Sequence, residues 1–154
     1  MASRKELLDK GGKYMTYASV AFVAYAVLFF ALNFWGTGFE LGVHEINGVS
    51  RQDLVAFNPA VLYYIGHLHV ATAGFIAATG IAVAALSWYG VRQGLKWTWV
   101  AATISPVVGL VVALPMHYFG LFEHNWILHL GPIYVATFLF VWGVWLGWKG
   151  LNMR

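Results

Sequence analysis

The chain has 154 residues, of which 60% are hydrophobic and 10% charged, and its formal net charge is +3. Soluble domains carry about 25% charged residues, so this composition excludes an ordinary soluble protein and indicates an integral membrane protein. No cysteine is present, which excludes disulfides, iron–sulfur clusters, thiolate copper sites and covalently attached haem c.

Uncharged apolar runs divide the chain into membrane-spanning segments. A helix needs about 20 such residues to cross a bilayer, and four runs meet this length, at about 14–35, 61–89, 97–117 and 126–148. We therefore expect one all-α domain, 1–154, folded as a bundle of four transmembrane helices. Residues 1–13 are polar and do not resemble a cleaved signal peptide, so the first helix is expected to be retained.

The basic residues predict the orientation in the membrane. Apart from Arg51, every Lys and Arg lies in residues 1–13, in the loop between the second and third runs, or after the fourth run. The positive-inside rule then places both termini and that loop in the cytoplasm, with a prokaryotic cytoplasmic membrane as the expected location. The two remaining connections are external and carry carboxylates that we interpret as solvated loop charges: Glu40, Glu45, Asp53 and Glu123.

Capping residues and prolines predict the details between and within the runs. Ser50 and Asp53 stand three residues apart before an apolar stretch, as in a capping box, and predict a short interfacial helix that ends at Asn58-Pro59. Pro106 and Pro115 are expected to bend the third run, because proline removes a backbone hydrogen bond.

The histidines are the candidate functional residues, and all of them fall on the predicted external side: His44, His67, His69, His117, His124 and His129. His67 and His69 lie two residues apart on a helix, so they point about 200° away from each other and serve different faces. Small residues follow each of them at helical spacing. The plain interpretation of these small-residue stripes is helix packing, and the functional one is a haem or metal beneath each histidine.

His117 ends the third run and His129 lies near the start of the fourth, so we expect them at similar depth. A single histidine at this depth is more often an interfacial or hydrogen-bonded residue than a ligand. The set of four histidines, with His67 and His69 besides His117 and His129, favours a bound group. Ionisable residues in a membrane are costly, and histidine is the commonest metal ligand. His44 and His124 lie in loops, where an ordinary polar role is favoured, although Glu123 could orient His124 as a ligand.

The second run resembles a helix of a known family. Tyr63 to Ile76, with His67-Leu68-His69 and Gly74, is similar to the histidine-x-histidine helix of the catalytic subunit of haem-copper oxidases and nitric oxide reductases, especially of the cbb3-type branch. The resemblance implies that His67 binds a high-spin haem iron and His69 a low-spin one. It is confined to this run.

Three functions follow as hypotheses. The first is a haem b electron-transfer protein with ligands among His67, His69, His117 and His129, small residues Gly74 and Gly109 beneath the haem, and Arg51 at its propionates. The second is a copper, iron or zinc site of an oxidoreductase, in which Glu123, His124 and Asp53 join these histidines. The third is a structural subunit of a membrane complex. The lipid bilayer is the expected surrounding, with quinone, other membrane subunits or a second copy as partners and no nucleic acid.

Overall fold

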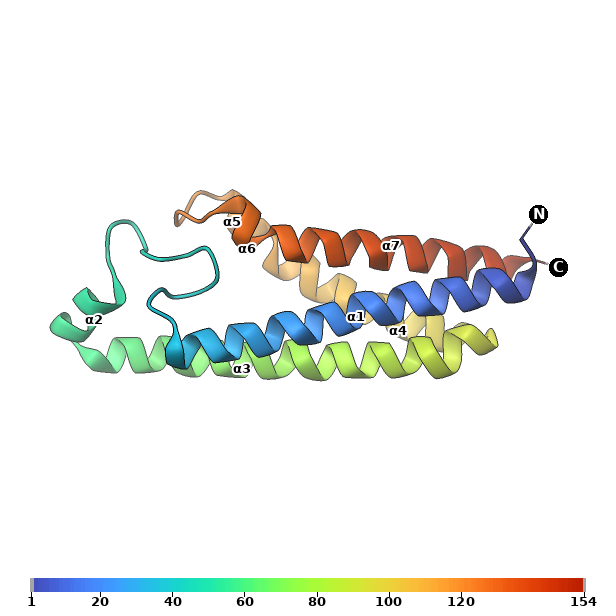
Figure 1. Cartoon of the computed structure of the whole chain (residues 1–154), viewed down its shortest axis with the longest axis horizontal. Coiled ribbons are helices and arrows are strands. Elements are labelled where there is room, and N and C mark those ends of the chain that lie inside the picture. The colour runs from blue at the N-terminus through green and yellow to red at the C-terminus, as the bar shows by residue number, and fades with distance from the viewer. Residues whose placement is uncertain (1, 154) are drawn as a thin grey trace.

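A computed structural model describes residues 2–153 of the chain. Within this range, four helical segments are long and apolar enough to cross a membrane, which confirms the predicted all-α bundle of four membrane-spanning helices. Both ends of the chain lie at the same end of the bundle, and the longer connecting loops lie at the opposite end, here called the distal end (Figure 1). The cytoplasmic location of the termini stays a prediction.

The helices follow one another along the chain without an intervening β-sheet in the described residues. They are α1 (Arg4–Trp35), α2 (Arg51–Phe57), α3 (Pro59–Ala85), the π-helical turn η1 (Leu86–Gly90), the 3₁₀ turn η2 (Val91–Gln93), α4 (Lys96–Ala113), α5 (Pro115–Tyr118), α6 (Trp126–His129) and α7 (Gly131–Asn152).

Helix α1 begins at Arg4, before the apolar run predicted at about 14–35. Ser3 and Glu6 form a capping box that satisfies the first free N–H groups of the helix. Asp9 then pairs with Lys13 on the same helix and with Arg92 of η2, each at 2.7 Å. These ion pairs let the polar residues extend the helix beyond its apolar part.

The fourth predicted run is two helices. Residues Trp126–His129 form α6, and the spanning helix α7 begins only at Gly131, inside the run predicted at about 126–148. Pro132 lies in the first turn of α7, where its missing N–H cannot continue the hydrogen bonds of α6. As a result, His129 lies in the distal segment before the span.

The predicted capping box and the break at Pro115 are confirmed, whereas a bend at Pro106 stays a prediction. Ser50 and Asp53 form a capping box at the start of α2, and the Asn58 side chain accepts a hydrogen bond from the N–H of Ala60 at the start of α3. Pro115 separates α4 from α5, and Pro106 lies inside α4.

Helix α1 packs against α7 on one side and α3 on the other (Figure 1). Glycines allow the contact with α7: a Cβ at Gly143 would lie 2.7 Å from the backbone N of Met15, and one at Gly11 only 2.5 Å from that of Gly147. Such glycines let the two backbones touch, which is how helices associate where lipid provides no hydrophobic driving force.

The small residues after His69 serve helix packing. Ala73 is buried, and a Cβ at Gly80 would lie 3.0 Å from the carbonyl oxygen of Ser19 on α1. By contrast, a Cβ at Gly74, in the stripe after His67, would meet nothing within 4 Å. The plain interpretation therefore holds for the His69 stripe, whereas the His67 stripe is open.

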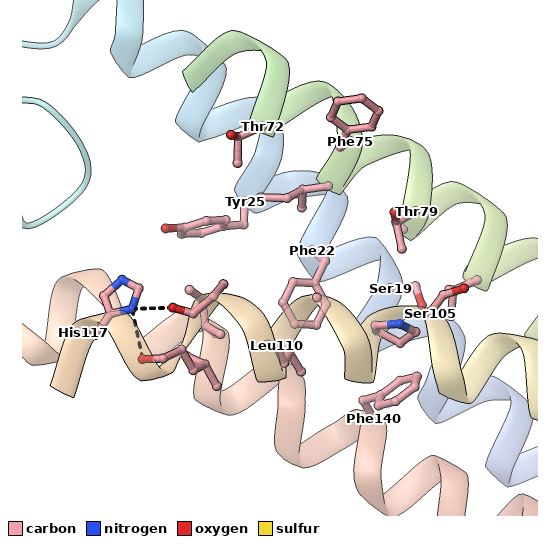
Figure 2. Close-up of a pocket in the computed structure, with 18 residues that line it drawn as sticks. Ser19, Phe22, Tyr25, Thr72, Phe75, Thr79, Ser105, Leu110, His117 and Phe140 are labelled. Atoms are coloured by element: carbon pink, nitrogen blue, oxygen red, sulfur yellow. Dashed lines mark hydrogen bonds between the residues drawn. The ribbon is translucent and has the colours of Figure 1, made fainter. Parts of the chain in front are cut away.

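Helix α4 is the least covered of the spanning helices. Its buried residues, Thr98 and Ala102, both lie in its first two turns, near the termini. Val108 and Val112 in its distal half are 57% and 71% exposed. A cavity lies between this half of α4 and α3, whose ribbons diverge toward the distal end (Figure 2).

Candidate functional site at the distal end

Five ionisable side chains from five segments meet at the distal end of the bundle, and we call them the distal cluster. They are Glu40 from the loop after α1, His69 from α3, His117 from α5, His124 from the loop before α6, and His129 from α6. Three of these segments follow breaks in the spanning helices, so the cluster depends on the caps and prolines described above.

The centre of the cluster is the pair His117 and His129, whose Nε2 atoms lie 2.9 Å apart. His129 Nδ1 lies 2.8 Å from the carbonyl oxygen of Leu41, and His117 Nδ1 lies 3.2 Å from that of Ala113 (Figure 2 draws the His117 contacts). A carbonyl only accepts, so these hydrogen bonds form in the tautomer that carries the proton on Nδ1. In the neutral rings, both Nε2 atoms then present lone pairs to each other.

Glu40 connects this pair to α3. One of its carboxylate oxygens lies 3.7 Å from Nε2 of His129, and the other lies 3.3 Å from Nε2 of His69. The interpretation of Glu40 as a solvated loop charge was wrong. Because a carboxylate beside a histidine fixes the orientation and charge of the ring, Glu40 makes the cluster one connected network.

The loop after α1 places Glu40 by folding back over the distal end. Phe39 and Val43 on either side of Glu40 are each 3% exposed. Gly42 adopts a positive φ of 76°, and its carbonyl accepts a hydrogen bond from the N–H of Asn125 at 2.8 Å. A Cβ at Gly42 would lie 3.0 Å from the backbone N of His129, so the turn fits directly against α6.

His124 is a third imidazole beside the pair His117 and His129. Its ring centre lies 5.5 Å from that of His117 and 5.3 Å from that of His129. Both of its ring nitrogens are buried and have no hydrogen-bond partner within the described residues. A buried polar group without a partner costs about 1–3 kcal/mol, so this ring is unsatisfied as it stands.

The protonation state of His129 determines whether a proton can be shared between the two facing Nε2 atoms. Burial lowers the pKa of His129, and this outweighs the hydrogen bond to Leu41 and the charge of Glu40, which both raise it. The ring is 2% exposed. Since its charged form is disfavoured, a shared proton is an unfavourable way to reconcile the two facing lone pairs.

The other candidate residues lie outside the distal cluster. His67 is exposed and lines a separate groove with Asn33 and Arg51. Arg51 donates to the carbonyl oxygens of Gly38 and Asn33, both at 3.1 Å, so its guanidinium holds the end of α1 and the loop that follows.

The two loop histidines, His44 and His124, differ in their exposure. His44 and Glu123 are exposed, in contrast to the half-buried His124. The expectation of an ordinary loop role therefore agrees with the position of His44, whereas His124 lies in the cluster.

The described residues contain no group of three His, Asp or Glu side chains already at metal-ligand spacing. Two ring nitrogens on one tetrahedral ion, with bonds of about 2.0–2.1 Å, lie about 3.3 Å apart. The 2.9 Å between the Nε2 atoms is shorter than this. An ion would have to spread the pair slightly and draw Glu40 or His124 inward.

Sequence reasoning missed Glu40, although a signal was present. Apolar Phe39, Leu41 and Val43 alternate around it, and such a segment is more typical of chain folded against a protein than of a solvated loop. The direction of the fold-back could not be read from this pattern.

Comparisons of the chain with protein-family profiles, with curated proteins and with solved structures found no match.

Proposed function

We propose that the chain is a membrane metalloprotein whose distal cluster binds one transition-metal ion, as part of an oxidoreductase. The observation that carries the proposal is the facing of two imidazole Nε2 lone pairs at 2.9 Å, with both Nδ1 atoms committed to backbone carbonyls. This is the tautomer in which histidine binds a metal, with the other ring nitrogen held by a backbone acceptor.

The donor set indicates the kind of metal. Imidazole and carboxylate, without thiolate in a cysteine-free chain, suit copper(II), iron and zinc. His117 and His129 would bind the ion, with Glu40 and the unsatisfied His124 as further donors, and His69 would hold the far oxygen of Glu40. Copper or iron would supply one-electron chemistry at this site.

The haem b hypothesis has less geometric support. Two axial histidines of one haem lie on opposite sides of a porphyrin plane, and their facing nitrogens are about 4 Å apart for iron–nitrogen bonds of about 2 Å. The Nε2 atoms of His117 and His129 are too close for this arrangement, and His67 lies in a different groove. Haem-based electron transfer and a purely structural role in a larger complex stay predictions, as does an external location of the cluster.

The test is the metal content of the detergent-purified protein. We expect about one copper, iron or zinc ion per chain after reconstitution of metal-free protein with each ion in turn, and an X-ray absorption spectrum dominated by nitrogen and oxygen neighbours with imidazole scattering. Failure to retain any of these ions would contradict the proposal. Sharp α and Soret bands in a reduced-minus-oxidised spectrum, with iron in equal amount, would replace it with the haem hypothesis.

The turn at Gly42 predicts a selective effect on metal affinity. Gly42→Ala forces a side chain into a positive φ and against the backbone N of His129, so we expect zinc affinity to fall about 10-fold, the effect of disturbing a ligand's supporting contacts. Gly48→Ala is the matched control, because Gly48 has a φ of 78° and a Cβ there would meet nothing within 4 Å. Competition titrations of zinc compare the two variants. Equal affinities would show that the turn does not position the ligands.

Acid is expected to release the metal. Histidine binds metals as the neutral ring, and its ordinary pKa is about 6.5. Because burial lowers the pKa of His129 in the folded protein, this ring is neutral at pH 7 and takes up a proton only below its ordinary value. In the metal-free protein the unfolded chain binds this proton first, so stability contributed by His129 is present above about pH 6.5 and is lost as the pH falls. Zinc titrations between about pH 7.5 and about pH 5 should show constant affinity at first and then a decline; no decline would contradict histidine ligation.

A further inference from the structure

A cavity of about 380 Å³ lies between α1, α3, α4 and α7 and runs from the middle of the bundle to the distal cluster (Figure 2). Its volume falls within the usual range of about 300–1,000 Å³ for small-molecule sites. No Asp, Glu, Lys or Arg lines it; apolar side chains line most of it, with a few hydroxyl groups and His117. Its interior therefore suits an uncharged molecule.

The two ends of the cavity carry different polar groups. Tyr25 and His117 lie toward one end in Figure 2, and Phe140 and Ser105 lie toward the other. Ser19 also lies at the Phe140 end, and its hydroxyl already donates to the carbonyl oxygen of Met15 at 2.8 Å. The Tyr25 and His117 end adjoins the distal cluster and offers the phenol of Tyr25 to a polar head, since both ring nitrogens of His117 already have partners.

The cavity opens toward lipid. Phe75 of α3 lines it and is nevertheless 76% exposed. Across the opening, the distal half of α4 stands away from α3, and Gly109 on this half lines the cavity with space beside it, since a Cβ there would meet nothing within 4 Å. A molecule dissolved in the bilayer can therefore enter sideways, without crossing water.

From these observations we propose that the cavity binds a neutral, lipid-soluble molecule with an apolar body and a hydroxyl or carbonyl head, and that the head lies at the Tyr25 and His117 end. The role of this molecule as the substrate of the metal centre rests on the proposed function; its binding does not. A quinone and a fatty alcohol share this chemistry, and the experiment distinguishes them.

The test is photolabelling of the full chain in phosphatidylcholine vesicles with dodecanol that carries a diazirine in its chain, followed by mass spectrometry of the labelled peptides. We expect labels on cavity-lining residues of α3 and α4. Excess unlabelled dodecanol or decylubiquinone should remove them, and dodecane, which has no polar head, should compete at least about 10-fold less well, as expected for the loss of a hydrogen-bonding group in a buried site. The stronger of the two competitors indicates the natural head group.

Three variants test whether the labels arise in the cavity. Gly109→Leu places a side chain in the cavity without a backbone clash, so labelling should fall at least about 10-fold, the effect of about 1.4 kcal/mol. Gly74→Leu makes the same substitution on α3, also with open space at its Cβ but outside the cavity lining, and should leave labelling unchanged. Tyr25→Phe keeps the ring and should remove the preference for headed competitors over dodecane.

Equal labelling of the Gly109→Leu variant and the unchanged protein would overturn the proposal. Labels that neither dodecanol nor decylubiquinone reduces would also overturn it, because they would come from contact with bulk lipid. Crosslinks from this opening to a second copy of the chain would also overturn it. The labelling is done with metal-free and with metal-loaded protein. If no metal binds and the labels remain, the metal centre fails and the cavity site stands; if metal binds and the labels are absent, the reverse holds.

Discussion

Replacing His129 by alanine is expected to abolish stoichiometric metal binding. His129 provides the Nε2 atom that faces both His117 and Glu40, so its loss removes the centre of the distal cluster. Changes to residues that only support a ligand lower affinity by about 10–100-fold, and the loss of the ligand itself should exceed about 100-fold. Metal analysis and competition titration measure the change.

His129 is buried, so its alanine variant also leaves a void in the protein. His117→Ala provides the second measurement, because His117 is only half-buried and its loss removes the other facing nitrogen. Glu40→Gln keeps the size of the side chain and removes its charge, and should lower affinity about 10-fold. A variant that binds no metal but keeps its elution volume and helical circular dichroism is a ligand variant rather than an unfolded one.

His67→Ala and His44→Ala are the controls. Both histidines are exposed and lie outside the distal cluster, so their removal should leave metal affinity unchanged. The opposite pattern, in which His67→Ala abolishes binding and His129→Ala does not, would contradict the proposed centre. It would instead agree with the resemblance to the histidine-x-histidine helix.

Gly143→Leu is expected to prevent α1 and α7 from packing together. A Cβ at this position would lie 2.7 Å from the backbone N of Met15 and 2.9 Å from the carbonyl oxygen of Gly11. Backbone atoms cannot move aside as a flexible side chain can, so the helices must separate. Overpacking a core typically costs about 1–3 kcal/mol, and we expect the upper end of this range or more. Thermal unfolding in detergent, followed by circular dichroism, should show a lower midpoint and a smaller yield of folded protein.

The matched control for this prediction is Gly74→Leu. A Cβ there meets nothing within 4 Å, and leucine is favoured over glycine in a helix by roughly 1 kcal/mol. Its unfolding midpoint should therefore stay the same or rise. Equal destabilisation by both substitutions would mean that the close approach of α1 and α7 does not hold the bundle together.

The packing of α1 against α7 also positions the distal cluster. Helix α1 packs against both α3 and α7, and the residues that follow α1 and precede α7 carry Glu40 and His129. A loss of packing between α1 and α7 should therefore also weaken metal binding. Loss of the metal should leave this packing unchanged, because the cluster lies at the distal end, whereas Gly11 and Gly147 meet near the start of α1 and the end of α7.

The sequence by itself determined the membrane-spanning class of the fold. Apolar runs of sufficient length must form helices in lipid, because each backbone N–H and C=O needs a partner within its own segment. The capping box of Ser50 and Asp53 and the break at Pro115 were also readable, because they depend only on neighbouring residues. The capping box of Ser3 and Glu6 at the start of α1 is a local signal of the same kind, whereas the ion pair of Asp9 with Arg92 was not readable, because the two residues are 83 positions apart in the chain.

Only the tertiary structure decided which histidines come together. Hydropathy places His67, His69, His117 and His129 at similar depth but leaves the order and rotation of the helices open. Packing of Ala73 and Gly80 against α1 turns His69 toward Glu40, while His67 faces another groove. Glu40 and His124 joined them through loops, whose direction depends on contacts distant in sequence, such as the hydrogen bond from Asn125 to Gly42.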